Sequence, residues 1–328
     1  MYDIITIGDA VIDTHVNIDN ASVECDVNTR ECQLCLDYAS KIPITDSFQS
    51  LGGNAANVAS GTARLGLKTA IVTTLGKDSN ARLIAAELKK SKVDTSLIQY
   101  DAKTKTRYSV VLNFRGERTI LSYHEERHYK LPKAMPAASW IYYTSLSRGF
   151  DDLQDSLLKY LDKHESVKLA FNPGSFQLKN SLNKVLEVLP RTDILIINLE
   201  EAERILNTSL KKEKTMSALV HKLINLGAKE VVITDAARGA TAGTMDEVWS
   251  VPVFPLPVVA KTGAGDAFSA GYLAARDNDH DLRTALTWGI ANSAGVISEH
   301  GPQKGLLDQK RLQAMINRFA NIKPKRLA

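Results

Sequence analysis

The stretch KTGAGDAFSAGYLAA, residues 261–275, places three small residues and an acid at the start of an apolar helical pattern. Gly263, Ala264 and Gly265 leave backbone N–H groups uncovered, and the first turn of a helix carries unpaired donors and a partial positive charge. Such a turn binds anions, including phosphoryl groups. Asp266 follows directly, where its carboxylate can accept a proton from an attacking hydroxyl. The spacing favours phosphoryl transfer, but it also suits a tightly packed helix start that Asp266 caps.

A second glycine-led stretch, GGNAANVASGTARLG at residues 52–66, also continues as a helical pattern. Gly52 and Gly53 come first, and Asn54 and Asn57 lie three residues apart on one face of the first turn. Amide side chains beside exposed glycine backbone can donate to and accept from the hydroxyls of a neutral polyol. Helix capping is an alternative interpretation of Asn54, but it does not account for Asn57.

The elements that must hold these two stretches alternate between short β-branched runs and helical patterns. Apolar runs separated by helices predict a mostly parallel sheet covered on both faces, which is an α/β fold with three α/β/α layers. The runs occupy residues 3–8, 69–76, 140–146, 167–172, 193–198 and 230–236.

Two segments interrupt this alternation and predict a small antiparallel sheet. Residues 106–124 have the pattern of two strands around the turn RGE, and extended pieces are expected at 10–20 and 40–50. We therefore expect a single domain over residues 1–328, with a lid formed by about residues 10–50 and 105–125. An exposed strand edge in such a lid favours a homodimer.

The composition bounds the remaining classes. The 328 residues are 44% hydrophobic and 24% charged, which is typical of soluble globular proteins, and the net charge of +4 does not call for a nucleic-acid partner. No apolar run is long enough to cross a membrane, and the first residues carry acids rather than a basic leader. Three cysteines fit a reducing compartment. We expect a cytoplasmic protein.

The sequence resembles the PfkB family of carbohydrate kinases, which have the ribokinase-like fold. The two glycine-led stretches match the family's paired signatures. NLEEAERIL supplies an N-x-x-E arrangement, and VVITDAARGA is similar to a nucleotide-binding V-T-x-G-x-x-G turn. The resemblance spans nearly the whole chain. It implies a three-layer core with a small antiparallel β lid, and ATP-dependent transfer of a γ-phosphoryl group to a hydroxymethyl group of a small sugar, with Mg2+.

The resemblance also implies a role for each matching residue. Asp266 would deprotonate the acceptor hydroxyl, and the N–H groups around Gly263, Ala264 and Gly265 would stabilise the transferring phosphoryl group. The acceptor pocket would consist of Asp13, Gly52, Gly53, Asn54 and Asn57. The nucleotide side would consist of Asn198, Thr234, Gly239 and Asn292, with Glu201 holding Mg2+ through water.

The chain departs from the family pattern at several positions. Ala260 stands where the family usually has an acid that helps to bind an activating monovalent cation, so potassium activation is not expected. Lys261 could supply part of the missing charge, or it could be an ordinary solvated lysine. Ala236 replaces the first glycine of the nucleotide turn, which is costly only if its φ is positive. GKDSNA retains Gly76 and Asp78 of a G-x-D-x-x-G pattern but not its last glycine.

Two segments carry patterns that zinc sites use. Cys25, Cys32 and Cys35 include a C-x-x-C pair, but a fourth ligand would have to come from His15 or an acid, so ordinary lid residues are the competing interpretation. HEERH, residues 124–128, matches a metalloprotease motif that needs a well-formed helix. It follows a strand pattern and precedes a proline, which disfavours that helix. A non-enzymatic sugar sensor is disfavoured by the intact GAGD.

The acceptor is less well defined than the reaction. GGN and Asp13 favour a small neutral sugar such as ribose or fructose. Arg107, Arg115 and Arg118 in the predicted lid hairpin leave a sugar phosphate open. A nucleoside is the main alternative, because Phe114 and FNPGSF, residues 171–176, could stack a base, although the same residues suit ordinary core packing.

Overall fold

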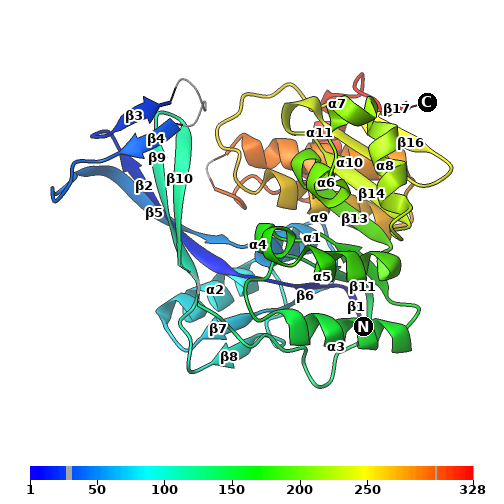
Figure 1. Ribbon diagram of the computed structural model, residues 1–328, viewed down its shortest axis with the longest axis horizontal. Coiled ribbons are helices and arrows are strands. Elements are labelled where there is room, and N and C mark those ends of the chain that lie inside the picture. The colour runs from blue at the N-terminus through cyan, green and yellow to red at the C-terminus, as the bar shows by residue number, and fades with distance from the viewer. Residues whose placement is uncertain (27–31, 124, 300, 328) are drawn as a thin grey trace.

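A computed structural model of the chain describes residues 1–26, 32–123, 125–299 and 301–327. Figure 1 shows a large body of helices around a central sheet, and a smaller sheet that projects from one side of it. This arrangement confirms the predicted α/β core and separate lid.

Over the described residues, the central sheet contains nine strands in the order β17-β16-β15-β14-β13-β12-β11-β1-β6. All neighbours from β6 to β14 are parallel, and the last three ladders, from β14 to β17, are antiparallel. The strands are β1 (Tyr2–Ile7), β6 (Thr69–Val72), β11 (Ala138–Tyr143), β12 (Lys168–Phe171), β13 (Ile194–Asn198), β14 (Glu230–Thr234), β15 (Ala240–Gly243), β16 (Val248–Val251) and β17 (Lys325–Arg326).

Helices cover both faces of this sheet, as the doubly apolar strands require. One face packs against α1 (Asn54–Arg64), α9 (Ala264–Asp277), α10 (Leu282–Ile297) and α11 (Gln309–Arg318). The other packs against α3 (Asp151–Lys163), α5 (Leu182–Val188), α6 (Leu199–Leu206) and α8 (Met216–Ile224). Successive strand residues alternate between the two cores, so Tyr142 enters the first and Tyr143 the second. The shorter α4 (Ser175–Asn180) and α7 (Leu210–Glu213) lie between these elements.

The predicted run at residues 69–76 is divided between two sheets. Its first half is β6, and its second half is β7 (Thr74–Gly76), which pairs in parallel with β8 (Gln99–Asp101) outside the central sheet. Helix α2 (Ser79–Lys90) follows β7. The chain therefore leaves the central sheet at Thr73, directly before the segment that supports the lid.

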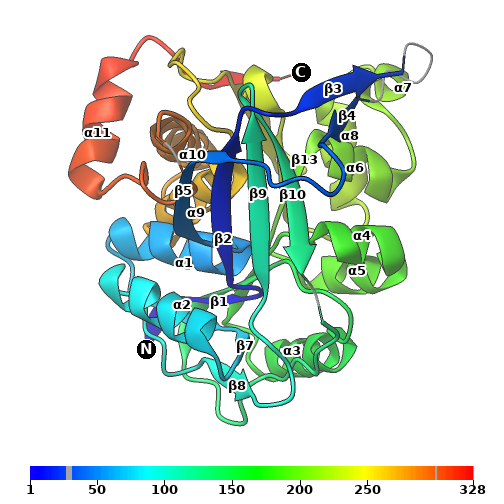
Figure 2. The same cartoon turned by 90° about the vertical axis from the view of Figure 1, so that its left-hand side faces the viewer.

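The lid sheet is formed by β2 (Val11–Ile18), β5 (Ile44–Gly52), β9 (Tyr108–Phe114) and β10 (Glu117–Tyr123) in the order β10-β9-β2-β5. Figure 2 shows these strands side by side, facing the viewer. The two outer ladders are antiparallel, whereas β2 and β9 are parallel because both strands run outward from the core.

The lid is fastened at its base by Gly76 and Asp78. Asp78 Oδ1 accepts from Ala81 N at 2.9 Å and so caps α2, while its Oδ2 accepts from Thr106 N at 2.7 Å. Gly76 N donates to Thr106 Oγ1 at 2.9 Å, and a Cβ on Gly76 would lie 2.6 Å from Thr106 N. The retained part of the G-x-D pattern therefore joins the lid hairpin to the core.

A hairpin of β3 (Ser22–Cys25) and β4 (Cys32–Cys35) lies at the lid tip, and a disulfide joins Cys25 to Cys32. The expectation of three reduced cysteines is therefore wrong. The alternative zinc site is also disfavoured, because Cys25 and Cys32 are bonded to each other and the described residues contain no His, Cys, Asp or Glu cluster arranged for a metal.

In the described part of the chain, none of the helices combines the length and apolar character needed to span a membrane. The cytoplasmic location stays a prediction.

Candidate active site

Two glycines in the first turn of α9 have different structural reasons. Gly263 has φ +79°, and a Cβ there would lie 2.5 Å from Pro302 Cβ, so both its backbone conformation and its packing require glycine. Gly265 is different. A Cβ built on this exposed residue meets nothing within 4 Å. Neither packing nor positive φ explains glycine at 265, but an open space at a helix N-terminus fits an anion.

Asp266 lies beside this space and has an unusual carboxyl group. Burial, with a smaller contribution from the nearby charge of Glu201, raises its pKa from 3.8 to about 7. A hydrogen bond from Asn57 acts in the opposite direction. A carboxyl with a pKa near neutral can take up and release a proton under ordinary conditions, as a general base must.

Asn57 connects the two glycine-led stretches. Its Nδ2 donates to Asp266 Oδ2 at 2.8 Å, and its Oδ1 accepts from Gln303 Nε2 at 2.9 Å. The residue is 5% exposed. Both ends of its amide are thus engaged within the protein, whereas the sequence predicted a side chain facing the acceptor.

The other residues of that stretch form the junction between the lid and α1. Gly53 caps α1 with φ +91°, and a Cβ there would lie 2.5 Å from Asp9 O. Asn54 is the first residue of α1 and is half-buried. A Cβ on Gly52 would overlap Asp13 Oδ2. Burial raises the pKa of Asp13, against the effects of Ser109 and Arg118.

The lid presents three rows of side chains on the face that carries Asp13. Strand register places residues in rows because side chains two positions apart share a face. The rows are Ser50, Asp13, Ser109 and Ser122 nearest the core; Phe48, His15, Val111 and Ile120 in the middle; and Asp46, Asn17, Asn113 and Arg118 outermost. We call them the inner, middle and outer rows.

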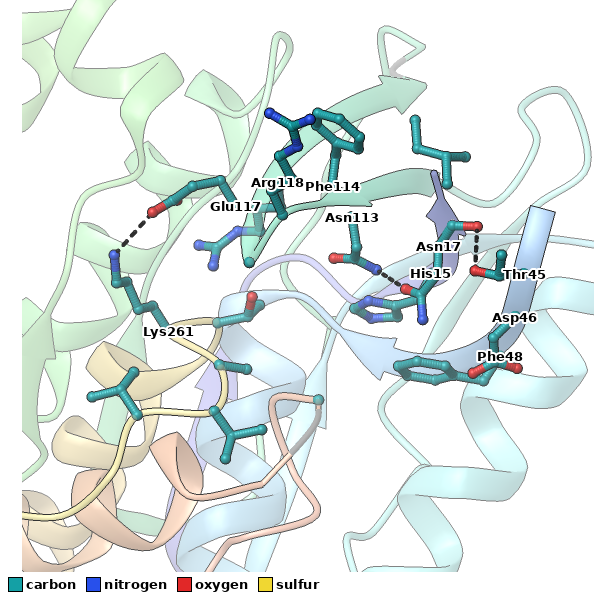
Figure 3. A pocket seen from close by; sticks show the side chains of 18 of the residues that line it. His15, Asn17, Thr45, Asp46, Phe48, Asn113, Phe114, Glu117, Arg118 and Lys261 are labelled. Atoms are coloured by element: carbon teal, nitrogen blue, oxygen red, sulfur yellow. Dashed lines mark hydrogen bonds and ion pairs between the residues drawn. The ribbon is translucent and has the colours of Figure 1, made fainter. Parts of the chain in front are cut away.

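His15 and Phe48 of the middle row and all four residues of the outer row line a cavity of about 860 Å³ between the lid and the loop before α9 (Figure 3). His15 and Phe48 stack with ring centroids 4.4 Å apart, and Asn113 Nδ2 donates to Asn17 Oδ1 at 3.0 Å. Lys261 Nζ lies 3.5 Å from Glu117 Oε1 and links the core to the lid tip across the cavity. Asp13 lies one row deeper than this lining.

The predicted nucleotide residues gather at the carboxyl ends of β13 and β14. Asn198 and Glu201 form a reciprocal cap of α6: Asn198 N donates to Glu201 Oε2, and Glu201 N to Asn198 Oδ1, both at 2.9 Å. Thr234 lies opposite Asn198 in the β13–β14 ladder. Gly239 ends the following turn with φ +107°. Burial raises the pKa of Glu201.

Two predicted residues lie elsewhere. Asn292 is fully buried between α9 and α10, where its Nδ2 donates to Ala267 O at 2.7 Å and its Oδ1 accepts from Leu307 N at 3.0 Å, so its amide is already occupied. Arg107 is 8% exposed and pairs with Asp9 at the base of the lid. A residue that binds a sugar phosphate must face the cavity. Arg115 and Arg118 line the cavity, but Arg107 does not.

Sequence reasoning missed Gln303 and Tyr142. Gln303 follows Pro302 in the loop after α10 and contacts Asn57, which lies 246 positions earlier. Tyr142 belongs to a run interpreted only as a strand, and burial, together with the charge of Asp266, raises its pKa. No local pattern marks either residue.

The metalloprotease motif does not form the helix that it needs. Glu125–His128 has no regular secondary structure, and His124 is outside the described residues. Arg127, in the middle of the motif, is buried and donates to Thr74 O at 2.7 Å, so this segment fastens the lid base instead.

The open space at Gly265 lies beside Asp266, and Asn57 of the first glycine-led stretch binds Asp266. A comparison with protein families agrees with the resemblance of these two stretches to the family's signatures. The model described as "pfkB family carbohydrate kinase" matches residues 16–309. The chain belongs to this family.

Relatives and solved structures agree with the family in fold. A ribokinase of Staphylococcus aureus is 25% identical over 264 residues, covering 78% of this chain and 84% of the relative. The Arabidopsis thaliana ribokinase in complex with ribose and ATP has a TM-score of 0.79 at 21% identity, covering 96% and 98% of the two chains. The nucleoside kinase of Methanocaldococcus jannaschii has a TM-score of 0.76 at 21% identity, with the same coverage.

Proposed function

We propose that this pfkB-family chain transfers the γ-phosphoryl group of ATP to a hydroxymethyl group of a small sugar. The observation that carries the proposal is the unfilled space at Gly265, directly beside a carboxyl whose pKa is about 7. The space suits the transferring phosphoryl group, and Asp266 can accept the proton that the acceptor hydroxyl loses.

The inner lid row supports a polyol as acceptor. Asp13 offers carboxylate oxygens to sugar hydroxyls, and Gly52 leaves room for that carboxylate. Gly53 and Asn54 begin the adjacent helix. A sugar ring held between Asp13 and Asp266 would place one hydroxyl against the general base, Asp266, and its other hydroxyls against the lid. Phosphoryl transfer requires such an alignment of the attacking hydroxyl.

The nucleotide would lie along the carboxyl ends of β13 and β14, bordered by Asn198, Thr234 and Gly239. Glu201 has the hard oxygen chemistry that Mg2+ prefers, and its burial near another carboxylate favours a cation there. Since Mg2+ retains waters and binds the nucleotide phosphates, one protein carboxylate fits it. When bound, Mg2+ would neutralise charge on those phosphates. Asn292 does not carry a nucleotide contact in this arrangement.

The N–H groups of the first turn of α9 would stabilise the phosphoryl group in transfer, because the helix leaves them without intrahelical acceptors and holds them in place. Asn57 holds Asp266 in place, so that the carboxylate keeps one orientation toward the acceptor. The lid would exclude water, which otherwise competes as the acceptor.

A coupled assay of ADP release tests the proposal. Ribose, fructose, fructose 6-phosphate and adenosine serve as acceptors with MgATP. We expect acceptor-dependent turnover that Asp266→Asn abolishes while ATP binding, measured by calorimetry, survives. Full turnover by Asp266→Asn would refute the assignment of the base, and binding of sugar without any turnover would favour a sensor.

The middle lid row favours a nucleoside as the second candidate. His15 and Phe48 stack on each other beyond the sugar position, and Val111 and Ile120 share their row. Such a row could receive a planar base, and the amides of Asn17 and Asn113 in the outer row could meet its polar edge. Faster turnover of adenosine than of ribose would select this candidate.

A homodimer through the lid is also proposed. The outer strand β10 exposes Ile120 by 48% and Leu121 by 55% of their surface. Over the described residues β10 is an end strand of the lid sheet, and an end strand with exposed apolar side chains favours pairing with a second strand. Light scattering on the wild type and on Leu121→Lys tests this, with a dimer expected only for the wild type.

A further inference from the structure

Gln303 lies in the loop between α10 and α11 and contacts the glycine-led stretch at the other end of the chain. Its Nε2 donates to Asn57 Oδ1 at 2.9 Å, and Asn57 Nδ2 donates to Asp266 Oδ2 at 2.8 Å. The three side chains form a chain of hydrogen bonds in which Gln303 donates to Asn57 and Asn57 donates to Asp266. An amide that accepts at its oxygen must present its NH2 group at the other end.

The loop that carries Gln303 is itself held firmly. Arg64 Nη1, at the end of α1, donates to Gln303 O at 3.3 Å and to Leu306 O at 3.1 Å. Pro302 fills the space beside Gly263. One short loop therefore contacts the cap of α9, the start of α1 and the end of α1. Because these contacts hold the loop in place, the Gln303 side chain can fix the orientation of the Asn57 amide with a single hydrogen bond.

We propose that Gln303 is a positioning residue for the general base: its donated hydrogen bond fixes the amide of Asn57 so that the NH2 group faces Asp266. The inference rests on the proposed function, in which Asp266 receives the proton of the acceptor. Gln303 touches no reacting atom and acts through Asn57 alone.

The groups that face Asp266 decide what a change at Gln303 does. Glu201 of α6 adds negative charge near Asp266, Tyr142 of β11 is held neutral beside it, and Asn57 of α1 donates to it. Only Asn57 among these three favours the ionised carboxylate. Loosening or reversing its amide leaves burial and Glu201 unopposed, and Asp266 then holds its proton more tightly.

Two substitutions separate the possibilities. Gln303→Met keeps the length of the side chain and removes the donor. Gln303→Glu keeps the shape and can only accept, so it attracts the NH2 group of Asn57 and turns the amide oxygen toward Asp266. Gln309 provides the matched control, because its Nε2 donates to Leu65 O at 3.0 Å on the surface, away from Asp266. Gln309→Met and Gln309→Glu make the same chemical changes there.

The experiment uses the full chain with MgATP and whichever of ribose, fructose and adenosine turns over fastest. We expect kcat to fall about tenfold or more in Gln303→Glu and about threefold in Gln303→Met, with the KM for ATP within about twofold of wild type. The two Gln309 variants should match the wild type. Thermal unfolding confirms that each variant is folded, and Gln303→Met carries the test if Gln303→Glu is not.

A second readout does not depend on turnover. In protein labelled with [13C]aspartate, the carboxyl resonance of Asp266 is the one that Asp266→Asn removes. Its titration midpoint should rise in Gln303→Met and stay unchanged in Gln309→Met. The inference is overturned if either readout is the same for the Gln303 and Gln309 pairs. If Asp266→Asn keeps full turnover, the proposed function fails instead, and the two failures are thus distinguishable.

Discussion

The carboxylate of Asp13 occupies the position where a side chain on Gly52 would begin. Asp13 lies in β2 and Gly52 at the end of β5, two strands that pair in the lid, and a Cβ on Gly52 would overlap Asp13 Oδ2. The φ of Gly52 is not positive, so its backbone does not demand glycine. The small residue is needed there because Asp13 needs the space.

Gly52→Ala should therefore damage acceptor binding more than ATP binding. The methyl group displaces the Asp13 carboxylate, and we expect kcat/KM for the acceptor to fall about a hundredfold, which corresponds to about 2.7 kcal/mol. The KM for ATP should change less than about threefold. Steady-state kinetics with each substrate varied in turn measure the two effects. An equal loss for both substrates would place Gly52 outside the acceptor pocket.

Gly265→Ala tests the opposite side of the transfer site. A Cβ at this position meets no protein atom within 4 Å, so the variant should fold with an unchanged melting temperature. The same methyl group would enter the space assigned to the phosphoryl group. We expect kcat to fall by about tenfold or more. Wild-type turnover by a stably folded Gly265→Ala would show that no ligand occupies this space.

The pH dependence follows from the raised pKa of Asp266. The base must be ionised, so kcat/KM for the acceptor should fall as the pH drops through about 7, with the slope of a single proton. The midpoint is measured in the free enzyme from initial rates between pH 5 and 9. If kcat/KM instead fell only near pH 4, the pKa of Asp266 would be close to its ordinary value, and its carboxyl would not be desolvated in solution.

The same pKa predicts a stability change. The folded state binds the proton of Asp266 more tightly than the unfolded chain does, because its pKa rises from 3.8 to about 7. Stability therefore decreases as the pH rises between these values, and above 7 the full cost is present. Asp266→Asn removes this cost. We expect it to be about 1–3 kcal/mol more stable than wild type at pH 8, with the difference shrinking toward pH 4 in urea titrations.

Short-range features of this fold could be predicted from the sequence, because one segment determines each of them. Glycine before a helical pattern identified both α1 and α9, and the apolar runs identified the parallel strands of the central sheet. The positive φ of Gly53 and Gly263 belongs to the same class. A local rule is sufficient wherever the constraint acts within a few residues.

Contacts between distant segments could not be predicted in this way. Asn57 meets Asp266 and Gln303 across 209 and 246 positions, so nothing near Asn57 shows that its amide is already occupied. Arg107 carries the charge expected of a phosphate ligand, but it forms an ion pair with Asp9 at the base of the lid. The disulfide between Cys25 and Cys32 depends on the β3–β4 pairing.

Ala236 replaces a family glycine and has φ +42°, so the substitution does cost free energy. A non-glycine residue in this region is strained by roughly 1 kcal/mol. Ala236→Gly should raise the free energy of unfolding by about 0.5–1 kcal/mol. Ala237→Gly, in the same turn without positive φ, should lower it by a similar amount. Urea unfolding of both variants measures the difference, and the same sign for both would contradict the strain.

Lys261 offers the last test, of the charge beside the transfer site. It follows Ala260, where the family usually has an acid, and its Nζ lies 3.5 Å from Glu117 Oε1 across the cavity. Both side chains are largely exposed, so the bridge itself contributes little. If Lys261 substitutes for a monovalent cation, wild-type activity should be equal in sodium, potassium and bulky organic-cation buffers.

Two variants separate the charge of Lys261 from its bridge to the lid. If the charge of Lys261, two residues before Gly263, acts on the phosphoryl group, Lys261→Ala should lose activity several-fold and Glu117→Gln should not. Initial rates in the three buffers measure this for both variants. Strong potassium activation of the wild type would refute the substitution, and equal losses in the two variants would assign Lys261 to closing the lid.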